Sequence, residues 1–120
     1  MKLIALRPTL WVEDVNATKD YYTGVLGFSV IHHSDNPGWA ILKCDAVELM
    51  LARPGKDFPY TGMYFSGSFY FETDAVDDWW ARLHDKAELF YPIENFSYGM
   101  REFAIRDCNG YILQFGQELK

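Results

Sequence analysis

One pattern of predicted elements occurs twice in this sequence, and it limits the possible folds more than any other feature. Asp14 and Asp74, half a chain length apart, each precede a segment whose apolar residues recur at helical spacing. A strand is predicted before each helix, and three strands are predicted after it. The repeated order βαβββ predicts an α+β fold. In it, two modules form one curved mixed sheet with both helices on the outer face and a concave cleft on the inner face.

The two modules are expected to cover about residues 1–53 and 67–120, joined by a Pro- and Gly-rich loop at 54–66. A chain of 120 residues has the length of one domain, so we expect a single domain built from both modules. The first predicted strand spans 3–12. Pro8 interrupts it, which argues for a sheet edge or a bulge at that position.

Charge and cysteine usage narrow the possible partners. The net charge of -6, without a run of basic residues, argues against nucleic acid. No apolar stretch approaches the roughly 18 residues of a membrane span, and the first residues do not read as a signal peptide. Cys44 and Cys108 lie in unrelated contexts, so we expect two free thiols and a cytoplasmic location.

Aromatic residues make up 18% of the chain. This content fits either a bulky core with a dimer interface or an aromatic-lined pocket.

The second predicted hairpin turns at residues 107–110, where Asn109 and Gly110 favour a tight turn. A symmetric turn there pairs Phe103 with Gln114 and Arg101 with Gly116. This register predicts that Phe103, Arg101 and Gln114 face the cleft.

The first predicted hairpin pairs Leu42 with Val47 and Trp39 with Met50. This register points a set of apolar side chains toward the helix: Val47, Leu49 and Leu51. Trp39 and Glu48 then face the cleft.

Three stretches of the sequence are similar to a known family. They are VEDVNATKDYYTGVLGF (12–28), GWAILKCDAVELMLARPG (38–55) and YGMREFAIRDCNGYILQFGQ (98–117). They resemble the vicinal oxygen chelate superfamily, which includes glyoxalase I, extradiol dioxygenases, fosfomycin-resistance enzymes and bleomycin-resistance proteins. The segment REFAIRDCNGYILQF, with GWAIL upstream, most resembles the bleomycin-resistance branch. Proteins of that branch are small homodimers that bind a cationic glycopeptide drug in interface grooves without transforming it.

The resemblance also implies where a metal would bind in this chain. Relatives that use a metal place ligands on the first, fourth, fifth and eighth strands, and those positions fall on Arg7, Glu48, Ser68 and Gln114. Only Glu48 is a good ligand for a divalent metal, and a guanidinium has no lone pair to donate. We therefore expect no metal, no other cofactor and no catalytic residues.

The predicted ligand-binding residues lie in the cleft, at its mouth or in the loop that could close over it. They are Asp35, Trp39, Glu48, Phe58, Tyr64, Tyr98, Arg101, Phe103 and Gln114. Structural alternatives stay open for several of them. Glu48 could form an ion pair with Arg7 or Arg101, Arg101 could pair with Glu102, and Trp39 could belong to the core.

Three functional hypotheses follow. The first is a non-catalytic homodimer that sequesters a bleomycin-like or other planar, cationic or aromatic small molecule. The second is a metal-dependent lyase or dioxygenase with an unconventional ligand set around Glu48. The third is an enzyme-like scaffold used for another small molecule or as an interaction module. No nucleophile motif and no phosphate-binding loop is present in the sequence.

Overall fold

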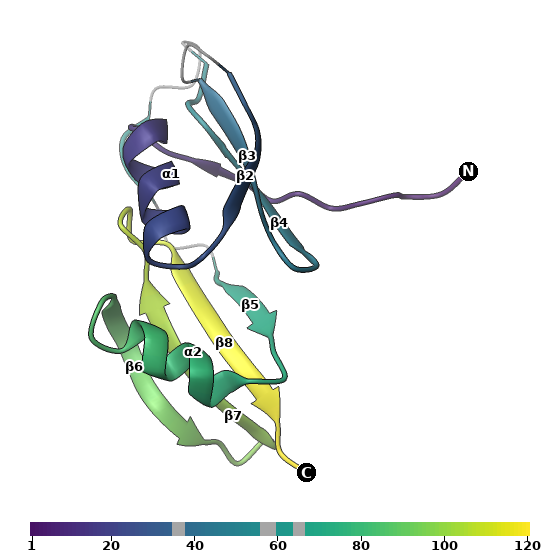
Figure 1. Cartoon of the computed structure of the whole chain (residues 1–120), viewed down its shortest axis with the longest axis vertical. Coiled ribbons are helices and arrows are strands. Elements are labelled where there is room, and N and C mark those ends of the chain that lie inside the picture. Colours follow the sequence, from purple (N-terminus) through teal and green to yellow (C-terminus); the bar gives the residue numbers. More distant parts are fainter. Residues whose placement is uncertain (35–37, 56–59, 64–66) are drawn as a thin grey trace. The chain divides into compact units, whose positions relative to one another are not determined.

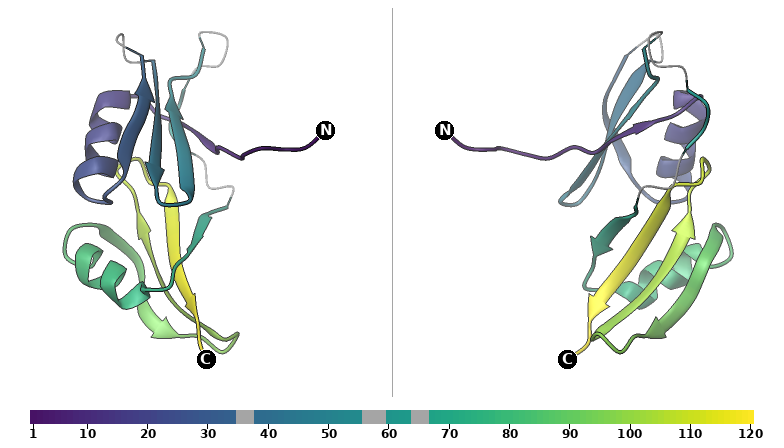
Figure 2. Two further views of the ribbon diagram at one scale, coloured as in Figure 1. Left: turned by 45° about the vertical axis from the view of Figure 1, so that its right-hand side comes forward. Right: turned by 180° about the vertical axis from the view of Figure 1, so that it is seen from behind.

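We describe the chain from a computed structural model, which covers residues 1–34, 38–55, 60–63 and 67–120. The chain divides into two compact units, residues 1–63 and 64–120. Figures 1 and 2 show that each unit consists of one sheet with one helix against one of its faces. The βαβββ order is present in both units, and the predicted α+β class is confirmed.

The first unit contains β1 (Thr9–Trp11), α1 (Val15–Gly24), β2 (Ser29–His33), β3 (Trp39–Cys44) and β4 (Val47–Ala52). Its strands lie in the order β1-β4-β3-β2, with β1 parallel to β4 and the other pairs antiparallel. The second unit contains β5 (Phe69–Glu72), α2 (Val76–Leu83), β6 (Glu88–Asn95), β7 (Met100–Arg106) and β8 (Ile112–Glu118). The order β5-β8-β7-β6 repeats the topology of the first unit, with β5 parallel to β8. Within the described residues, no helix is long and apolar enough to cross a membrane.

Helix α1 begins as the sequence predicts. The Asp14 carboxylate accepts a hydrogen bond of 2.9 Å from the backbone N–H of Ala17, which caps the helix. The buried side of α1, with Val15 and Tyr22, packs on the sheet. The sheet supplies a set of fully buried apolar side chains: Leu10, Ala40, Leu42, Leu49 and Leu51. This layer is the core of the first unit.

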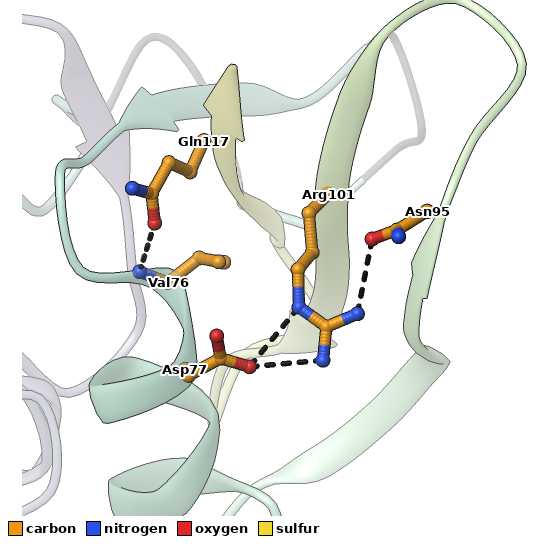
Figure 3. Close-up of polar contacts among 5 residues, drawn as sticks. All are labelled: Val76, Asp77, Asn95, Arg101 and Gln117. Atoms are coloured by element: carbon orange, nitrogen blue, oxygen red, sulfur yellow. Dashed lines mark hydrogen bonds and ion pairs between the residues drawn. The ribbon is translucent and has the colours of Figure 1, made fainter. Parts of the chain in front are cut away.

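Helix α2 begins differently from the prediction. Asp74 does not cap it. Ala75 is the N-cap residue and offers no side-chain acceptor. Instead, Oε1 of Gln117 on β8 accepts the N–H of Val76 at 3.0 Å (Figure 3). A neighbouring strand therefore satisfies one of the free donors at the start of the helix.

Both parallel edge strands are shorter than predicted. β1 starts at Thr9 because Pro8 has no N–H to donate, although its carbonyl still accepts the Met50 N–H at 2.9 Å. The residues before it are not part of the expected strand over 3–12, and Leu3 and Ile4 are almost fully exposed. Figure 1 shows this N-terminal segment running away from its sheet. β5 covers only the middle of the strand predicted over 67–73.

The predicted register of the second hairpin is wrong by one residue. Phe103 pairs with Phe115, Arg101 with Gln117 and Ala104 with Gln114. Oδ1 of Asp107 accepts the N–H groups of Asn109 and Tyr111 at 2.8 and 2.9 Å. The Asp107 N–H donates to the Tyr111 carbonyl at 2.8 Å, so the loop holds one residue more than a symmetric turn, and Gly110 in it has a φ of 95°. A shift of one residue exchanges the two faces of one strand relative to the other.

The predicted register of the first hairpin is wrong by two residues. Cys44 pairs with Val47 across a two-residue turn, in which Asp45 has a φ of 51°, and Trp39 pairs with Ala52. A shift of two residues preserves the faces, because side chains alternate with a period of two. Leu49 and Leu51 are buried toward the helix as predicted, and Trp39 and Glu48 lie on the opposite face.

Candidate functional site

On the first sheet, the face away from α1 carries an ion pair at two positions where metal-dependent relatives are expected to place ligands. Nε of Arg7 lies 3.1 Å from Oε2 of Glu48. The Glu48 side chain is only 17% exposed, whereas that of Arg7 is 46% exposed. The structural alternative for Glu48, a salt bridge to Arg7, is therefore confirmed. Much of the negative charge of Glu48 is neutralised within the unit.

Two indoles stand in one row on the same face. Trp11 on β1 and Trp39 on β3 both pair with Ala52 of the strand between them. Neighbouring strands lie about 4.8 Å apart, so the backbones carrying the indoles are about 10 Å apart. Their exposed fractions are 43% and 36%. The small side chain of Ala52 leaves the two rings as the largest groups of the row.

On the second sheet, the face away from α2 carries a buried carboxylate. Glu102 on β7 is 1% exposed. Its Oε1 accepts the hydroxyl of Tyr70 at 3.0 Å, and its Oε2 accepts the hydroxyl of Tyr91. Nε2 of Gln114 lies 3.5 Å from the same Oε2 and donates to the Tyr91 hydroxyl at 2.8 Å. These neutral donors offset much of the cost of burying the charge.

The other two positions implied by the resemblance belong to the same network. Ser68 donates its hydroxyl hydrogen to Oε1 of Gln114. Gln114 lies on the face away from the helix, as predicted. Its side chain is committed to Ser68, Tyr91 and Glu102. Ser68 is exposed and Gln114 is half-buried, so this network extends from the surface to the buried carboxylate.

Gly116 makes the position of Tyr70 possible. Gly116 pairs with Glu102, and the Tyr70 ring lies across it to reach the carboxylate. A Cβ at position 116 would stand 1.9 Å from the Tyr70 hydroxyl oxygen. Glycine is required here by this close approach of a neighbouring side chain.

The surroundings of Glu102 change the titration of the tyrosines. Burial and then the Glu102 carboxylate raise the pKa of Tyr70 from 10.0 to about 12. Burial also raises the pKa of Tyr91, where the Gln114 amide opposes the effect and Glu102 adds to it. Loss of solvent around the hydroxyl and then the nearby Glu102 carboxylate raise the pKa of Tyr98 to about 12. All three hydroxyls therefore keep their protons at neutral pH.

We expect the fold to lose stability as the pH rises from about 10 to about 12. The unfolded chain releases the Tyr70 proton near pH 10, whereas the folded chain holds it up to about pH 12, so the stabilisation is complete below pH 10. Urea unfolding between pH 8 and 12, followed by tryptophan fluorescence, measures this loss. Tyr70→Phe should show a shallower decline. An equal decline in both proteins would contradict the prediction.

Phe103 and Arg101 are not on the predicted face. Phe103 is fully buried, stacks on Phe115 with ring centroids 5.1 Å apart and meets the edge of Trp80 from α2. The Arg101 guanidinium donates to Asp77 on α2 at 2.9 and 3.0 Å and to Asn95 at 3.0 Å (Figure 3). Both residues hold α2 on the sheet. The one-residue shift at the Asp107 turn explains why the predicted positions were wrong.

The remaining predicted residues are Tyr98, Asp35, Phe58 and Tyr64. Tyr98 lies in the turn between β6 and β7, is 63% exposed and stacks on Phe96 with centroids 5.3 Å apart. It interacts with Glu102 from this position. Asp35, Phe58 and Tyr64 lie outside the described residues.

Comparison with known proteins gives the family. The model of the Glyoxalase/Bleomycin resistance protein/Dioxygenase superfamily matches residues 4–115. The chain belongs to this superfamily. A curated bleomycin resistance protein from Geobacillus stearothermophilus is 25% identical over 94% of this chain and 96% of its own.

Solved structures of this superfamily's fold agree with the match. TnmS3, an antibiotic binding protein from Streptomyces sp. CB03234, superposes with a TM-score of 0.75 at 20% identity over 98% of this chain and 99% of its own. A lactoylglutathione lyase from Agrobacterium tumefaciens gives 0.74 at 21% identity over 95% and 92%. These neighbours, at such identities, show the fold alone.

The residues at the implied metal positions of this superfamily member do not fit a divalent metal. The Arg7 guanidinium occupies one position and holds the Glu48 carboxylate, while Ser68 and Gln114 hydrogen-bond to each other. A fixed cation beside the single anionic ligand opposes a metal ion directly. Among the described residues, no group of three or more His, Cys, Asp or Glu side chains could hold a metal.

Sequence reasoning missed Glu102, Tyr70, Tyr91 and Trp11. The tyrosines had no distinguishing pattern, because a strand of alternating aromatic residues is typical of any half-buried sheet. One signal was available at Gly116. An isolated glycine inside a predicted strand indicates that another group approaches the backbone closely.

Proposed function

We propose that this chain binds a small planar molecule, cationic or aromatic, without transforming it. The observation that carries the proposal is the internal pairing of Arg7 with Glu48 and of Ser68 with Gln114. At the positions that the resemblance assigns to metal ligands, this chain carries side chains that satisfy one another. The fold and its positions are retained, which favours binding over a metal-dependent lyase or dioxygenase reaction.

Aromatic surface supports a planar ligand. The Trp11–Ala52–Trp39 row offers two indoles whose strands are about 10 Å apart, and a flat ring system between two stacked rings needs about 7 Å. The net charge of -6 favours a cation at long range. The names of the relatives, a bleomycin resistance protein and an antibiotic binding protein, are in keeping with this class of ligand.

The proposed binding residues are Trp39, Glu48, Tyr98 and Gln114, and the predictions for Asp35, Phe58 and Tyr64 also stand. In the proposal, the protein is a homodimer with clefts at the subunit interface, as the resemblance implies for the bleomycin-resistance branch. Sedimentation of the intact chain tests the dimer. The cytoplasm stays the predicted location, because the two cysteines lie in unrelated sequence contexts, which is typical of a reducing compartment.

We expect Trp39→Ala to weaken the binding of a planar cation by roughly two- to thirtyfold, because one stacked ring with its cation–π attraction contributes on the order of 0.5–2 kcal/mol and every 1.4 kcal/mol is tenfold. Proflavine, a flat tricyclic cation, is a suitable probe, and its fluorescence reports a titration directly. Trp39 lies at a strand end and is partly exposed, so the variant should fold.

The matched control is Phe90→Ala, which removes an aromatic side chain of similar exposure from β6. Its affinity for proflavine should stay within about twofold of the wild type. Equal losses in both variants, or no saturable binding to the wild type, would overturn the proposed role of Trp39. A requirement for added zinc or nickel would favour the metal-dependent alternative.

A further inference from the structure

The hydrogen bonds of the Glu102 network all run in one direction, toward its interior, and the proposed function does not use this. The network consists of Glu102, Tyr70, Tyr91, Gln114 and Ser68. Every hydroxyl hydrogen described in it points inward: those of Tyr70 and Tyr91 go to Glu102, and that of Ser68 goes to Gln114. Nε2 of Gln114 also donates inward, to Tyr91 and Glu102. The groups left for a ligand are therefore the lone pairs of hydroxyl oxygens, and these accept hydrogen bonds.

The carboxylate beneath these hydroxyls has no counter-ion among the described residues. The ion pairs of the described chain are Arg7–Glu48 and Arg101–Asp77, and neither includes Glu102. Arg101 is adjacent in sequence, but its guanidinium lies on the α2 side of the sheet (Figure 3). Glu48, in contrast, already has a guanidinium partner. Of these two carboxylates, Glu102 is therefore the one without a cationic partner among the described residues.

The network also reaches the surface. Tyr70 is 43% exposed and Tyr98 is 63% exposed, whereas Glu102 itself is covered. A hydroxyl that donates to a carboxylate becomes a stronger acceptor, because hydrogen bonds in a chain polarise one another. The rings of Tyr70 and Tyr98 add a surface that attracts cations.

We propose that this network is a recognition site for a cationic N–H donor, an ammonium or amidinium group that donates to the Tyr70 hydroxyl above the buried charge of Glu102. A quaternary ammonium has the charge but no hydrogen to donate, and a neutral amide has the hydrogens but no charge. Both should bind less well. The inference rests on the proposed function only in taking the ligand to be a cation, and it assigns the recognition of charge to Glu102 instead of Glu48.

The test uses three probes of similar size with the intact protein: benzamidinium, benzyltrimethylammonium and benzamide. Affinities are measured by following protein NMR signals during titration. We expect benzamidinium to bind the wild type at least about tenfold more tightly than either of the others. Equal affinity for benzamidinium and benzyltrimethylammonium would overturn the requirement for an N–H donor. Absence of benzamidinium binding would overturn the site.

Two variants locate the site. Glu102→Gln removes the charge in nearly the same shape, and Tyr70→Phe keeps the charge but removes the outward acceptor. Each should weaken benzamidinium binding by about tenfold or more. Asp85→Asn, which removes an exposed carboxylate after α2, is the control and should change the affinity less than about twofold. Unchanged affinity in Tyr70→Phe, or an equal loss in all three variants, would overturn the proposal.

The stability of Glu102→Gln is measured by urea unfolding alongside the titrations. If this variant does not fold, the benzamidinium affinity of Tyr70→Phe alone tests the site. Trp39→Ala separates this inference from the proposed function. Benzamidinium binding that survives Trp39→Ala but is lost in Tyr70→Phe supports the Glu102 site even if proflavine fails to bind. Proflavine binding that depends on Trp39 stands even if benzamidinium fails to bind.

Discussion

Phe103→Ala is expected to lower the free energy of unfolding by about 3–5 kcal/mol, the usual cost of removing a fully buried phenylalanine. Phe103 has no exposed surface and lies between the stacked ring of Phe115 and the edge of Trp80, so its removal leaves a cavity under α2. Urea unfolding followed by tryptophan fluorescence measures the loss. The outcome separates a core position from the ligand-facing position that a symmetric turn predicts.

Phe90→Ala serves as the control for this measurement. Phe90 is 43% exposed, and its ring lies 4.8 Å from the Arg106 guanidinium carbon. Its truncation should cost about 1 kcal/mol or less. If Phe103→Ala were as mild as Phe90→Ala, the observed register of β7 and β8 would be contradicted.

Gly116→Ala is expected to destabilise the protein by about 1.5–3 kcal/mol, the range for losing a hydrogen bond to a charged group. The added methyl would overlap the Tyr70 ring, so Tyr70 has to leave Glu102. The sign is informative, because glycine to alanine inside a strand otherwise stabilises by roughly 0.5–1 kcal/mol. Equilibrium unfolding in urea gives the difference directly.

A double-mutant cycle with Tyr70→Ala isolates this overlap. The three atoms nearest to the new methyl group all belong to the Tyr70 side chain, so removing that side chain removes the overlap they cause. Gly116→Ala should then be neutral or stabilising. A penalty of the same size in both backgrounds would show that the cost lies in the backbone and not in the position of Tyr70.

The repeated element order and the hydrophobic spacing were sufficient to predict the fold class. Both depend only on the types of residue that recur and on the distances between them along the chain. Asp14 was correctly predicted to cap α1, since its carboxylate needs only the N–H groups of the following turn. Asp74 was not the cap of α2, because Gln117 from β8 takes an N–H there. A cap supplied by a strand 41 residues away leaves no local pattern in the sequence.

The residues on the sheet face away from the helix could be predicted in the first unit but not fully in the second. Both hairpin registers were wrong, yet the error at Asp45–Ala46 was an even number of residues and left Trp39 and Glu48 on the predicted face. The error at the Asp107 turn was one residue, which is an odd number. It placed Phe103 and Arg101 on the wrong face and hid Glu102, whose chemistry is the most distinctive of that sheet.

The Asp107 turn has a consequence for how this fold could diversify. Loss of one residue from the loop between β7 and β8 would favour a symmetric turn, in which Phe103 and Glu102 exchange faces relative to β8. A carboxylate would then lie beneath α2, and a phenyl ring would lie in the polar network. Selection on the length of this loop is therefore selection on the core and on the proposed ligand surface together. Deletions here should be rare among functional relatives, even though loops usually tolerate changes of length more readily than strands.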